Sequence, residues 1–541
     1  MKKFSWLLFG FILGLNPNLL WPQNTSNLKL LAHVNPAPGT TYSEVTGCGD
    51  LAIIGAFQGN SFVWIYDLTD KTNPALLSAI PIQQACLDVQ VHGRYLFISF
   101  RNGMAWYDIL DPRQPKLVKD FRPSPSINAH TSFVSGNTLY IADQVSGGVR
   151  IFDVTDKSNP QPLANLQDPG WTIHDMTVIR GRMYAAWIFG QPSGQLMLAD
   201  VANPSQPRVL AKVRYPQAGT HNAWPTEDGQ YIFSTDEVNG TRHNLKVWDA
   251  RTSGQLTQVT EYTPPTVAAN STIHNVYVRG RYAYMSYYCE GVHIYDIADP
   301  RQPREVARYD FNGTEPCISY FSNWGVDPFS DLIYASDMEQ GLFVLEFDDH
   351  PAANLAGKVI DASTGAPVSG AMVYFLDEYP TSRTDAAGEF GIPWFRNDTV
   401  RLVTEAADYH PDTTTATTRT AEKTSLTIRL RRLSTGVESA VEAPKNFALL
   451  PTYPNPFSSA GVASALQIAF RLPQPERVQL EIFNTFGQRV RALLRAPRAA
   501  GTHAIAWDGT DDGGLLLPAG IYFARLHAGK FSAARKITLM R

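Results

Sequence analysis

Short apolar stretches alternate with polar turns through the first 350 residues of the chain. Six stretches end in Asp, and five of them are followed by turns rich in Asp, Asn and Pro, as in FVWIYDLTDKTNP and GVHIYDIADPRQP. The recurring acids are Asp67, Asp108, Asp153, Asp200, Asp249 and Asp296, with Glu346 in a degenerate seventh copy. The copies are 41 to 50 residues apart, the usual length of one four-stranded propeller blade. The pattern predicts a seven-bladed β-propeller over residues 27–350.

The same pattern predicts how the ring closes. The seventh copy stops after its third strand at Phe347, whereas residues 27–34 (NLKLLAHV) form an extra strand before the first copy. If the N-terminal strand completes the last blade, no sheet edge stays open. The recurring Asp stands directly before a turn, where its side chain accepts backbone N–H groups, so we interpret it as a turn-forming residue rather than a catalytic one.

The N-terminus has the layout of a secretory signal peptide. Lys2 and Lys3 precede an apolar run from Phe4 to Leu15, which Asn16 and Pro17 end. This layout predicts a signal peptide over residues 1–23. No other stretch reaches the roughly 18 apolar residues of a spanning helix, so we expect no transmembrane span in the mature form. A secreted or surface-attached protein is the expectation.

Composition narrows the fold class and the partners. The 46 Lys plus Arg against 50 Asp plus Glu give a formal charge of −4, which argues against a nucleic-acid partner. The chain is 44% hydrophobic and 11% aromatic and has 39 Gly and 37 Pro. This excludes a disordered polyelectrolyte and favours turn-rich, all-β structure.

Four cysteines, Cys48, Cys86, Cys289 and Cys317, permit two disulfides in an exported chain. Of the three pairings, we favour Cys48 with Cys86 and Cys289 with Cys317. Four buried free thiols are the alternative.

Polar residues recur at one register of the strand that opens each copy. They are Glu44, Asp88, His130, His174, His221 and His274, with Trp324 in the seventh copy. Because the first strand of each blade lines the channel, we expect these side chains to meet around the axis at one depth. Asp175, Asn222 and Asn275 each follow a histidine and are expected on the other strand face, where they could hold neighbours by hydrogen bonds.

Imidazole and carboxylate groups together suit Zn, Fe, Mn, Cu or Ni. The cofactor is unknown from these residues, and a divalent transition metal is the candidate. A polar, water-filled channel is the alternative. With a metal, activated water with Glu44 or Asp88 as base would support hydrolysis, and iron would support oxygenase chemistry. No nucleophile triad, Walker loop or HExxH motif occurs, which favours binding over catalysis.

Two further groups flank the strands. Asp236, Glu237, Asp337 and Glu339 follow second strands, and we interpret them as solvated loop acids. Trp171, Trp187, Trp224 and Trp324 lie near the inner strands. They could form a stacking floor for a sugar or peptide, or pack between blades.

The repeats resemble the LVIVD-repeat family and, more closely, the β-propellers called choice-of-anchor B. The motifs that carry the resemblance include THNAWPTEDGQYIFSTDE, IHNVYVRGRYAYMSYYCEGVHIYD and NWGVDPFSDLIYASDMEQGLFVL. That family is found on exported bacterial proteins, and its biochemical role is largely undefined. The resemblance therefore implies a fold and a location but no reaction.

Residues 353–432, which contain NLAGKVIDASTGAPVSGAMVYF, resemble the carboxypeptidase regulatory-like domain. This resemblance implies a small prealbumin-like β-sandwich that acts as a spacer without a catalytic role. The Ser-, Glu-, Pro- and Ala-containing stretch 433–447 is interpreted as a linker.

Residues 448–541 contain YPNPF, WDGTDDGG and PAGIYF in this order. They resemble the C-terminal sorting domain of type IX secretion, an immunoglobulin-like β-sandwich related to flagellar-hook-cap domains. The resemblance implies the type IX secretion machinery as a partner, followed by release or attachment at the outer-membrane surface.

These observations predict a secreted or cell-surface propeller that acts as a binding or adhesion module for an extracellular protein or glycan. Two alternatives stay open. One is a metal-dependent extracellular hydrolase or oxygenase at the histidine ring. The other is a structural component of a surface layer.

Overall fold

The computed structural model describes residues 25, 27–59, 61–123, 126–237, 244–263, 271–311, 322–420, 422–433, 446–450, 452, 455, 457–458, 466–513 and 515–540. The predicted signal peptide, residues 1–23, and most of the predicted linker, 433–447, lie outside these residues. The chain forms two compact units, Met1–Leu433 and Ser434–Arg541. Every regular element in the described ranges is a β-strand, so no helix there is long and apolar enough to cross a membrane.

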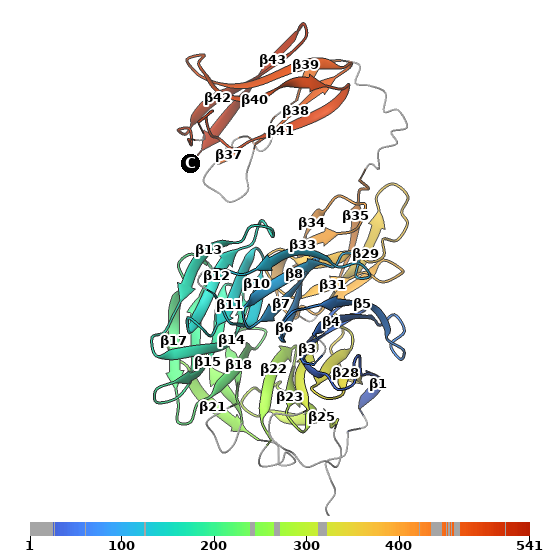
Figure 1. Cartoon of the computed structure of the whole chain (residues 1–541), viewed down its shortest axis with the longest axis vertical. Coiled ribbons are helices and arrows are strands. Elements are labelled where there is room, and N and C mark those ends of the chain that lie inside the picture. Colours follow the sequence, from blue (N-terminus) through green and yellow to red (C-terminus); the bar gives the residue numbers. More distant parts are fainter. Residues whose placement is uncertain are drawn as a thin grey trace, which may run out of the picture. The chain divides into compact units, whose positions relative to one another are not determined.

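Seven four-stranded antiparallel sheets form the blades of a propeller (Figure 1). Blade 1 contains β2 (Thr41–Cys48), β3 (Leu51–Gln58), β4 (Phe62–Asp67) and β5 (Ala75–Pro81); blade 2 contains β6 (Cys86–His92), β7 (Tyr95–Phe100), β8 (Gly103–Asp108) and β9 (Lys116–Phe121). Blade 3 contains β10 (Ala129–Ser135), β11 (Thr138–Asp143), β12 (Gly148–Asp153) and β13 (Gln161–Leu166); blade 4 contains β14 (Trp171–Ile179), β15 (Arg182–Gly190), β16 (Gln195–Asp200) and β17 (Arg208–Arg214). Blade 5 contains β18 (Thr220–Pro225), β19 (Tyr231–Asp236), β20 (Leu245–Asp249) and β21 (Thr257–Tyr262); blade 6 contains β22 (Ile273–Arg279), β23 (Tyr282–Tyr287), β24 (Gly291–Asp296) and β25 (Arg304–Tyr309).

Blade 7 closes the ring with a strand from the other end of the chain. Its order is β26 (Asn323–Asp327), β27 (Ile333–Asp337), β28 (Gly341–Phe347) and β1 (Leu28–Val34). β1 pairs antiparallel with β28, from Leu28 opposite Phe347 to Val34 opposite Leu342. The predicted closure is confirmed, and β28 is not left as an open edge.

The first strand of each blade lines the channel, and these inner strands pack against one another around the ring. Asp88 and Gln90 accept hydrogen bonds from the backbone N–H groups of Ser132 and Val134 at 2.8 Å each. Asp88 and then Gln90 of β6 thus contact Ser132 and then Val134 of β10. Because the contacts follow the same order along both strands, β6 and β10 run in the same direction. Apolar side chains between blades form the core, and Trp187 and Trp248 are among its largest buried members.

The recurring acid of each repeat builds the turn that follows it. In each of six blades its Oδ1 accepts the backbone N–H of the residue two positions later, as for Thr155 and Asp153 at 2.7 Å. This is the local bond by which Asp stabilises a turn. The prediction that these acids are turn-forming is confirmed.

Asp153→Ala is expected to lower the free energy of unfolding by about 1 kcal/mol, because one hydrogen bond to the backbone is lost. Asp153→Asn keeps the side-chain oxygen and should cost less. Urea unfolding of both variants measures the difference. An equal loss in both would contradict the assignment.

The predicted disulfide between Cys48 and Cys86 is wrong, because both residues are buried free thiols. Cys48 ends β2, whereas Cys86 begins β6. Since successive inner strands run in the same direction, the two residues lie toward opposite ends of the channel, too far apart for a disulfide. Cys289 is disulfide-bonded, and its predicted partner Cys317 lies outside the described residues.

Cys48 and Cys86 are expected to react with a thiol reagent only after unfolding. Burial raises the pKa of the Cys48 thiol to about 12 and raises that of Cys86 as well, which suppresses the reactive thiolate. Mass spectrometry of labelled peptides, in native buffer and in denaturant without reductant, tests this. Rapid labelling in native buffer, or no labelling in denaturant, would contradict the structure.

A β-sandwich follows the propeller within the same compact unit. One sheet has the order β32 (Glu389–Ile392), β29 (Leu355–Asp361), β35 (Thr424–Leu430), and the other β31 (Thr381–Arg383), β30 (Met372–Phe375), β33 (Asp398–Glu405), β34 (Asp412–Thr418). We call it the sandwich domain. The spacer role implied by the resemblance does not fit, because this domain packs directly on the propeller.

The second unit is an immunoglobulin-like β-sandwich. Its sheets have the orders β36 (Ala448–Leu449), β38 (Leu466–Leu472), β41 (Gly501–Trp507) and β37 (Phe457–Ser458), β43 (Phe531–Met540), β42 (Gly520–Ala528), β39 (Glu476–Asn484), β40 (Arg489–Arg498). Trp507 lies in a core of alternating apolar residues from both sheets.

Candidate metal centre

Four histidines enter the channel at irregularities near the start of β10, β14, β18 and β22. In β14, Ile173 pairs with Trp187 and Asp175 with Ala186, so His174 between them has no partner of its own. His221 and His274 are skipped in the same way. An extra residue of this kind bends its strand and redirects the side chain.

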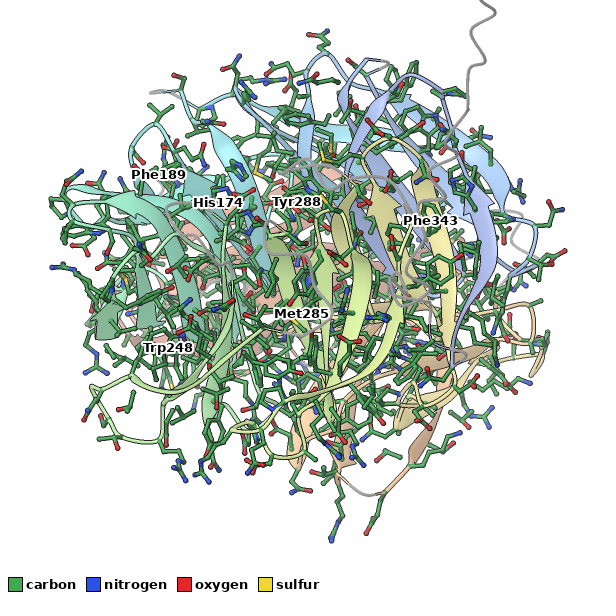
Figure 2. The ribbon with its side chains drawn as sticks, turned by 90° about the horizontal axis from the view of Figure 1, so that it is seen from below. His174, Phe189, Trp248, Met285, Tyr288 and Phe343 are labelled. Carbon is green, nitrogen blue, oxygen red and sulfur yellow. The ribbon has the colours of Figure 1, made fainter. Side chains whose placement is uncertain are left out.

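The four rings form a continuous arc, which we call the imidazole layer: His130, His174, His221 and His274. Successive ring centroids are 3.9, 4.1 and 4.3 Å apart. The ring of Trp324 in blade 7 extends the arc, 5.0 Å from His274. The structure thus brings together the four histidines that the repeat alignment singled out. In Figure 2, His174 and Tyr288 lie nearer the middle of the view than Phe189 does.

The prediction that Glu44 and Asp88 share the depth of the histidines is wrong. In blade 2 the skipped residue is Leu87, since Cys86 pairs with Phe100 and Asp88 with Ser99. Asp88 therefore corresponds to Asp175 of blade 4, one position after the histidine. In blade 1 both Ser43 and Glu44 are skipped, as His130 and Thr131 are in blade 3, so Glu44 corresponds to Thr131, one position after the histidine. Counting residues back from the recurring Asp does not reveal this shift, because the inner strand holds an extra residue.

Glu44, Asp88, Asp175, Asn222 and Asn275 form a second layer, which we call the acidic layer. Asn222 Nδ2 donates to Asp175 Oδ2 at 2.7 Å, and Asn275 Nδ2 donates to Glu44 Oε2 at 3.1 Å. The asparagines make the hydrogen bonds expected of them, but the predicted placement on the other strand face is wrong, because Asp175, Asn222 and Asn275 line the same cavity as the histidines. In blade 7 Gly325 leaves room for Glu44, because a Cβ there would lie 2.0 Å from Glu44 Oε1.

Burial sets opposite protonation tendencies in the two layers. It raises the pKa of Asp88 to about 7 and that of Glu44 well above its usual value, with neighbouring carboxylates adding to both. It lowers the pKa of His130 to about 4 and that of His221 to about 3. The pKa values of His174 and His274 are also lowered well below the usual range by burial. Near neutral pH the four imidazoles are uncharged, the form that binds metals.

Backbone carbonyls of the next blade orient the rings. Nδ1 of His274 lies 2.5 Å from the carbonyl oxygen of Trp324, which suits a proton on Nδ1 and leaves the lone pair on Nε2. The ring of His221 is buried and contacts the backbone of His274 in the same way, and its Nε2 faces Glu237.

Glu237 completes this site and was misassigned from sequence as a solvated loop acid. Its Oε2 lies 3.5 Å from His221 Nε2. One ligand atom each from His174, His221 and Glu237 all lie within 4.8 Å of one another. Tyr288 donates a hydrogen bond to Glu237 Oε1 at 3.2 Å. The position of Glu237 could have been inferred from antiparallel pairing. Glu237 follows the end of β19, and this end lies beside the start of β18, where His221 lies.

Of the other acids in that group, Glu339 is exposed, as predicted, whereas Asp236 and Asp337 have structural roles. Asp236 is buried and pairs with Lys246 at 2.6 Å. Asp337 accepts hydrogen bonds from Ser322 Oγ at 2.7 Å and from the N–H of Glu339 at 2.9 Å. These contacts stabilise turns and strand ends rather than hold a ligand.

The tryptophans do not form an exposed stacking floor. Trp187, Trp224 and Trp324 are buried. Trp171 is partly exposed, and it is covered by Arg214, 4.0 Å from its ring, and donates to the carbonyl of Ser193 at 2.9 Å. Trp171 thus packs within blade 4, whereas Trp224 and Trp324 line the cavity of the channel.

Both layers line one cavity of about 70 Å³. Sites for organic ligands are usually roughly 300–1,000 Å³, so this cavity suits water or an ion. His130 and Glu237 are partly exposed, in contrast to the other three histidines. They mark where the imidazole layer meets solvent.

Three families match separate parts of the chain. Residues 85–122, 128–165 and 272–311 match the LVIVD repeat, which corresponds to blades 2, 3 and 6. Residues 354–431 match the carboxypeptidase regulatory-like domain, and residues 456–530 match the FlgD Ig-like domain.

Among solved structures, the computationally designed Ika8 protein is 10% identical with a TM-score of 0.41, covering 58% of this chain and 98% of its own. The Cps50 (Swd1) β-propeller domain of Myceliophteria thermophila is 14% identical with a TM-score of 0.44, covering 58% and 98%. No curated protein matches the chain. The chain thus combines LVIVD repeats in a β-propeller with a carboxypeptidase regulatory-like domain and an Ig-like domain.

Proposed function

We propose that this protein is an exported binding module that holds one divalent transition-metal ion in the imidazole layer, through His174, His221 and Glu237. The observation that carries the proposal is the convergence of these three ligand atoms within 4.8 Å of one another. The burial of His221 and the 3.5 Å distance between its Nε2 and Glu237 Oε2 support it.

The donor set suits such an ion. Two neutral imidazoles and a carboxylate are ligands of Zn²⁺ and related metals, with bonds of about 2.0–2.2 Å. Ligand atoms on opposite sides of one ion then lie at most roughly 4.4 Å apart. The three groups need to move together by only a few tenths of an ångström, and side-chain rotation can supply this.

Export and surface placement are part of the proposal. The signal-like segment at residues 1–23 supports export, and the motifs YPNPF, WDGTDDGG and PAGIYF support a type IX sorting role for the Ig-like domain. The machinery of that route would then be a partner, and the binding target an extracellular protein or glycan. A choice-of-anchor B assignment of the propeller fits the same placement.

Metal-dependent hydrolysis is the second candidate function. Two His and one Glu are the ligand set of several catalytic zinc sites, where a fourth position is left for water. The partial exposure of Glu237 gives that position access to solvent. The cavity around the layer is too small for a substrate, which ranks this function below binding.

The test is elemental analysis of the purified full chain beside a variant with His174, His221 and His274 changed to Ala. About one equivalent of metal in the wild type and none in the variant supports the proposal. If the folded wild type binds none of the added Zn, Fe, Mn or Cu, both the metal site and the hydrolase function are contradicted.

A further inference from the structure

The sandwich domain covers the propeller face on which the inner strands end. Gly49, Gly93, Gly136, Gly181 and Gly280 lie in the turns that follow β2, β6, β10, β14 and β22. Contacts to the sandwich domain come from successive blades: Gly93 N donates to Thr381 Oγ1 at 2.9 Å, Ser135 Oγ to the Asp377 carbonyl at 2.8 Å, Arg180 N to Glu378 Oε1 at 2.8 Å, and Arg396 Nε to Glu227 Oε2 at 2.9 Å.

The contact is close enough to require glycine in the propeller turns. Gly93 has a φ of 57°, and a Cβ there would lie 2.9 Å from the ring of Tyr374. A Cβ on Gly49 would lie 2.6 Å from the backbone oxygen of Arg383. A side chain at either turn would push the domain away, so the turns and the domain fit as one packed interface.

Buried groups fix this interface. Met372 belongs to an apolar cluster of blades 1 and 2, with its Sδ 3.8 Å from Cys48 Sγ. Arg279, which is 1% exposed, donates to the carbonyl oxygens of Pro328, Ser330 and Pro351. These contacts tie the segment between the domains to blades 6 and 7.

One side chain of the sandwich domain enters the channel. The ring of Tyr379 lies 5.9 Å from that of Phe133 and 5.2 Å from that of Phe329. It lines the same cavity as the imidazole and acidic layers. Burial raises the pKa of its hydroxyl, which a hydrogen bond with the Thr46 side chain partly offsets.

We propose that the sandwich domain is a fixed stopper of the propeller channel, with Tyr379 as its tip. The imidazole layer then exchanges water and ions with solvent only through the opposite face, where His130 and Glu237 are partly exposed. Tyr379 is a positioning residue in this arrangement, because it closes the floor below the acidic layer and touches no ligand of the ion. The stopper itself is independent of the proposed metal site, and only the metal-release measurement below rests on it.

The test measures access to the floor in the full chain. Thr46 is 3% exposed and lies beside Tyr379, so Thr46→Cys places a thiol there, and a small methanethiosulfonate reagent probes it. We expect slow modification with Tyr379 present and at least about tenfold faster modification with Tyr379→Ala. Tyr379→Phe keeps the ring and should stay slow. Tyr409→Ala, in the same domain but away from the channel, is the matched control and should also stay slow.

Tyr379→Val serves as the milder variant if Tyr379→Ala melts at a much lower temperature. Fast modification already with Tyr379 in place, or no acceleration in a folded Tyr379→Ala or Tyr379→Val chain, overturns the stopper. In metal-loaded protein, Tyr379→Ala should also release the ion to a chelator faster. A protein without metal would fail only this last measurement, and the thiol result would still decide the stopper.

Discussion

Replacing Leu28 by Asp is expected to lower the free energy of unfolding of the propeller by roughly 3–5 kcal/mol. Leu28 is 2% exposed and packs in an apolar cluster with Leu345 and Phe347 of β28. The substitution removes a buried apolar side chain and places a carboxylate in the same space. Because β1 is the strand that closes the ring, the damage falls on the junction between the two ends of the propeller.

Leu30→Asp on the same strand is the matched control. Leu30 is 39% exposed, so its loss should change the free energy of unfolding by less than about 1 kcal/mol. Chemical denaturation followed by tryptophan fluorescence measures both variants. A small, equal change in both would mean that β1 does not complete blade 7 in solution.

The repeat made the propeller and its closure predictable from sequence. Each blade carries the same local signal, an apolar strand that ends in Asp before a turn, so errors in one copy are corrected by the others. The missing fourth strand after Phe347 and the extra strand ahead of the first copy then had one simple solution. Because the same local pattern recurs in every blade, the fold could be predicted without knowing which distant residues pack together.

The position of each residue along the channel axis was less predictable than the fold. One extra residue in a strand shifts every neighbouring side chain by one position along the channel. Nothing in the letters LDVQV shows that Leu87 is the unpaired residue and that Asp88 is the next paired one. The role of Glu237 depends on which strand ends meet at the channel. Both are consequences of strand register, which sequence alignment by the recurring Asp does not fix.

The stopper could not be predicted from sequence. The residues that form it are far apart in the chain, as in the contact between Tyr379 and Phe133, and the resemblance of each domain to a family describes the domain alone. Only the turn glycines hint at it, since Gly49 and Gly93 also suit ordinary hairpin turns without a neighbour. Contacts between domains carry no periodic signal in either sequence.

The second large effect is expected at the metal centre. His221→Ala should weaken binding of the metal ion by at least about 100-fold, more than the 10–100-fold typical of losing a group that only orients a ligand. His221 belongs to the three-ligand group, and its Nε2 lies 3.5 Å from Glu237 Oε2. Competition with a chelator of known affinity measures the dissociation constant.

Two further variants separate a ligand from a general effect on the fold. Glu237→Gln keeps an oxygen able to accept from Tyr288 but removes the charge, and it should weaken metal binding by about 10–100-fold. His33→Ala removes an exposed histidine of β1, outside the channel, and should leave affinity unchanged. Unaltered affinity in His221→Ala, with the variant folded, would place the ion elsewhere. A loss in His221→Ala but none in Glu237→Gln would instead assign the ion to the histidines alone, with His130 or His274 as the third ligand.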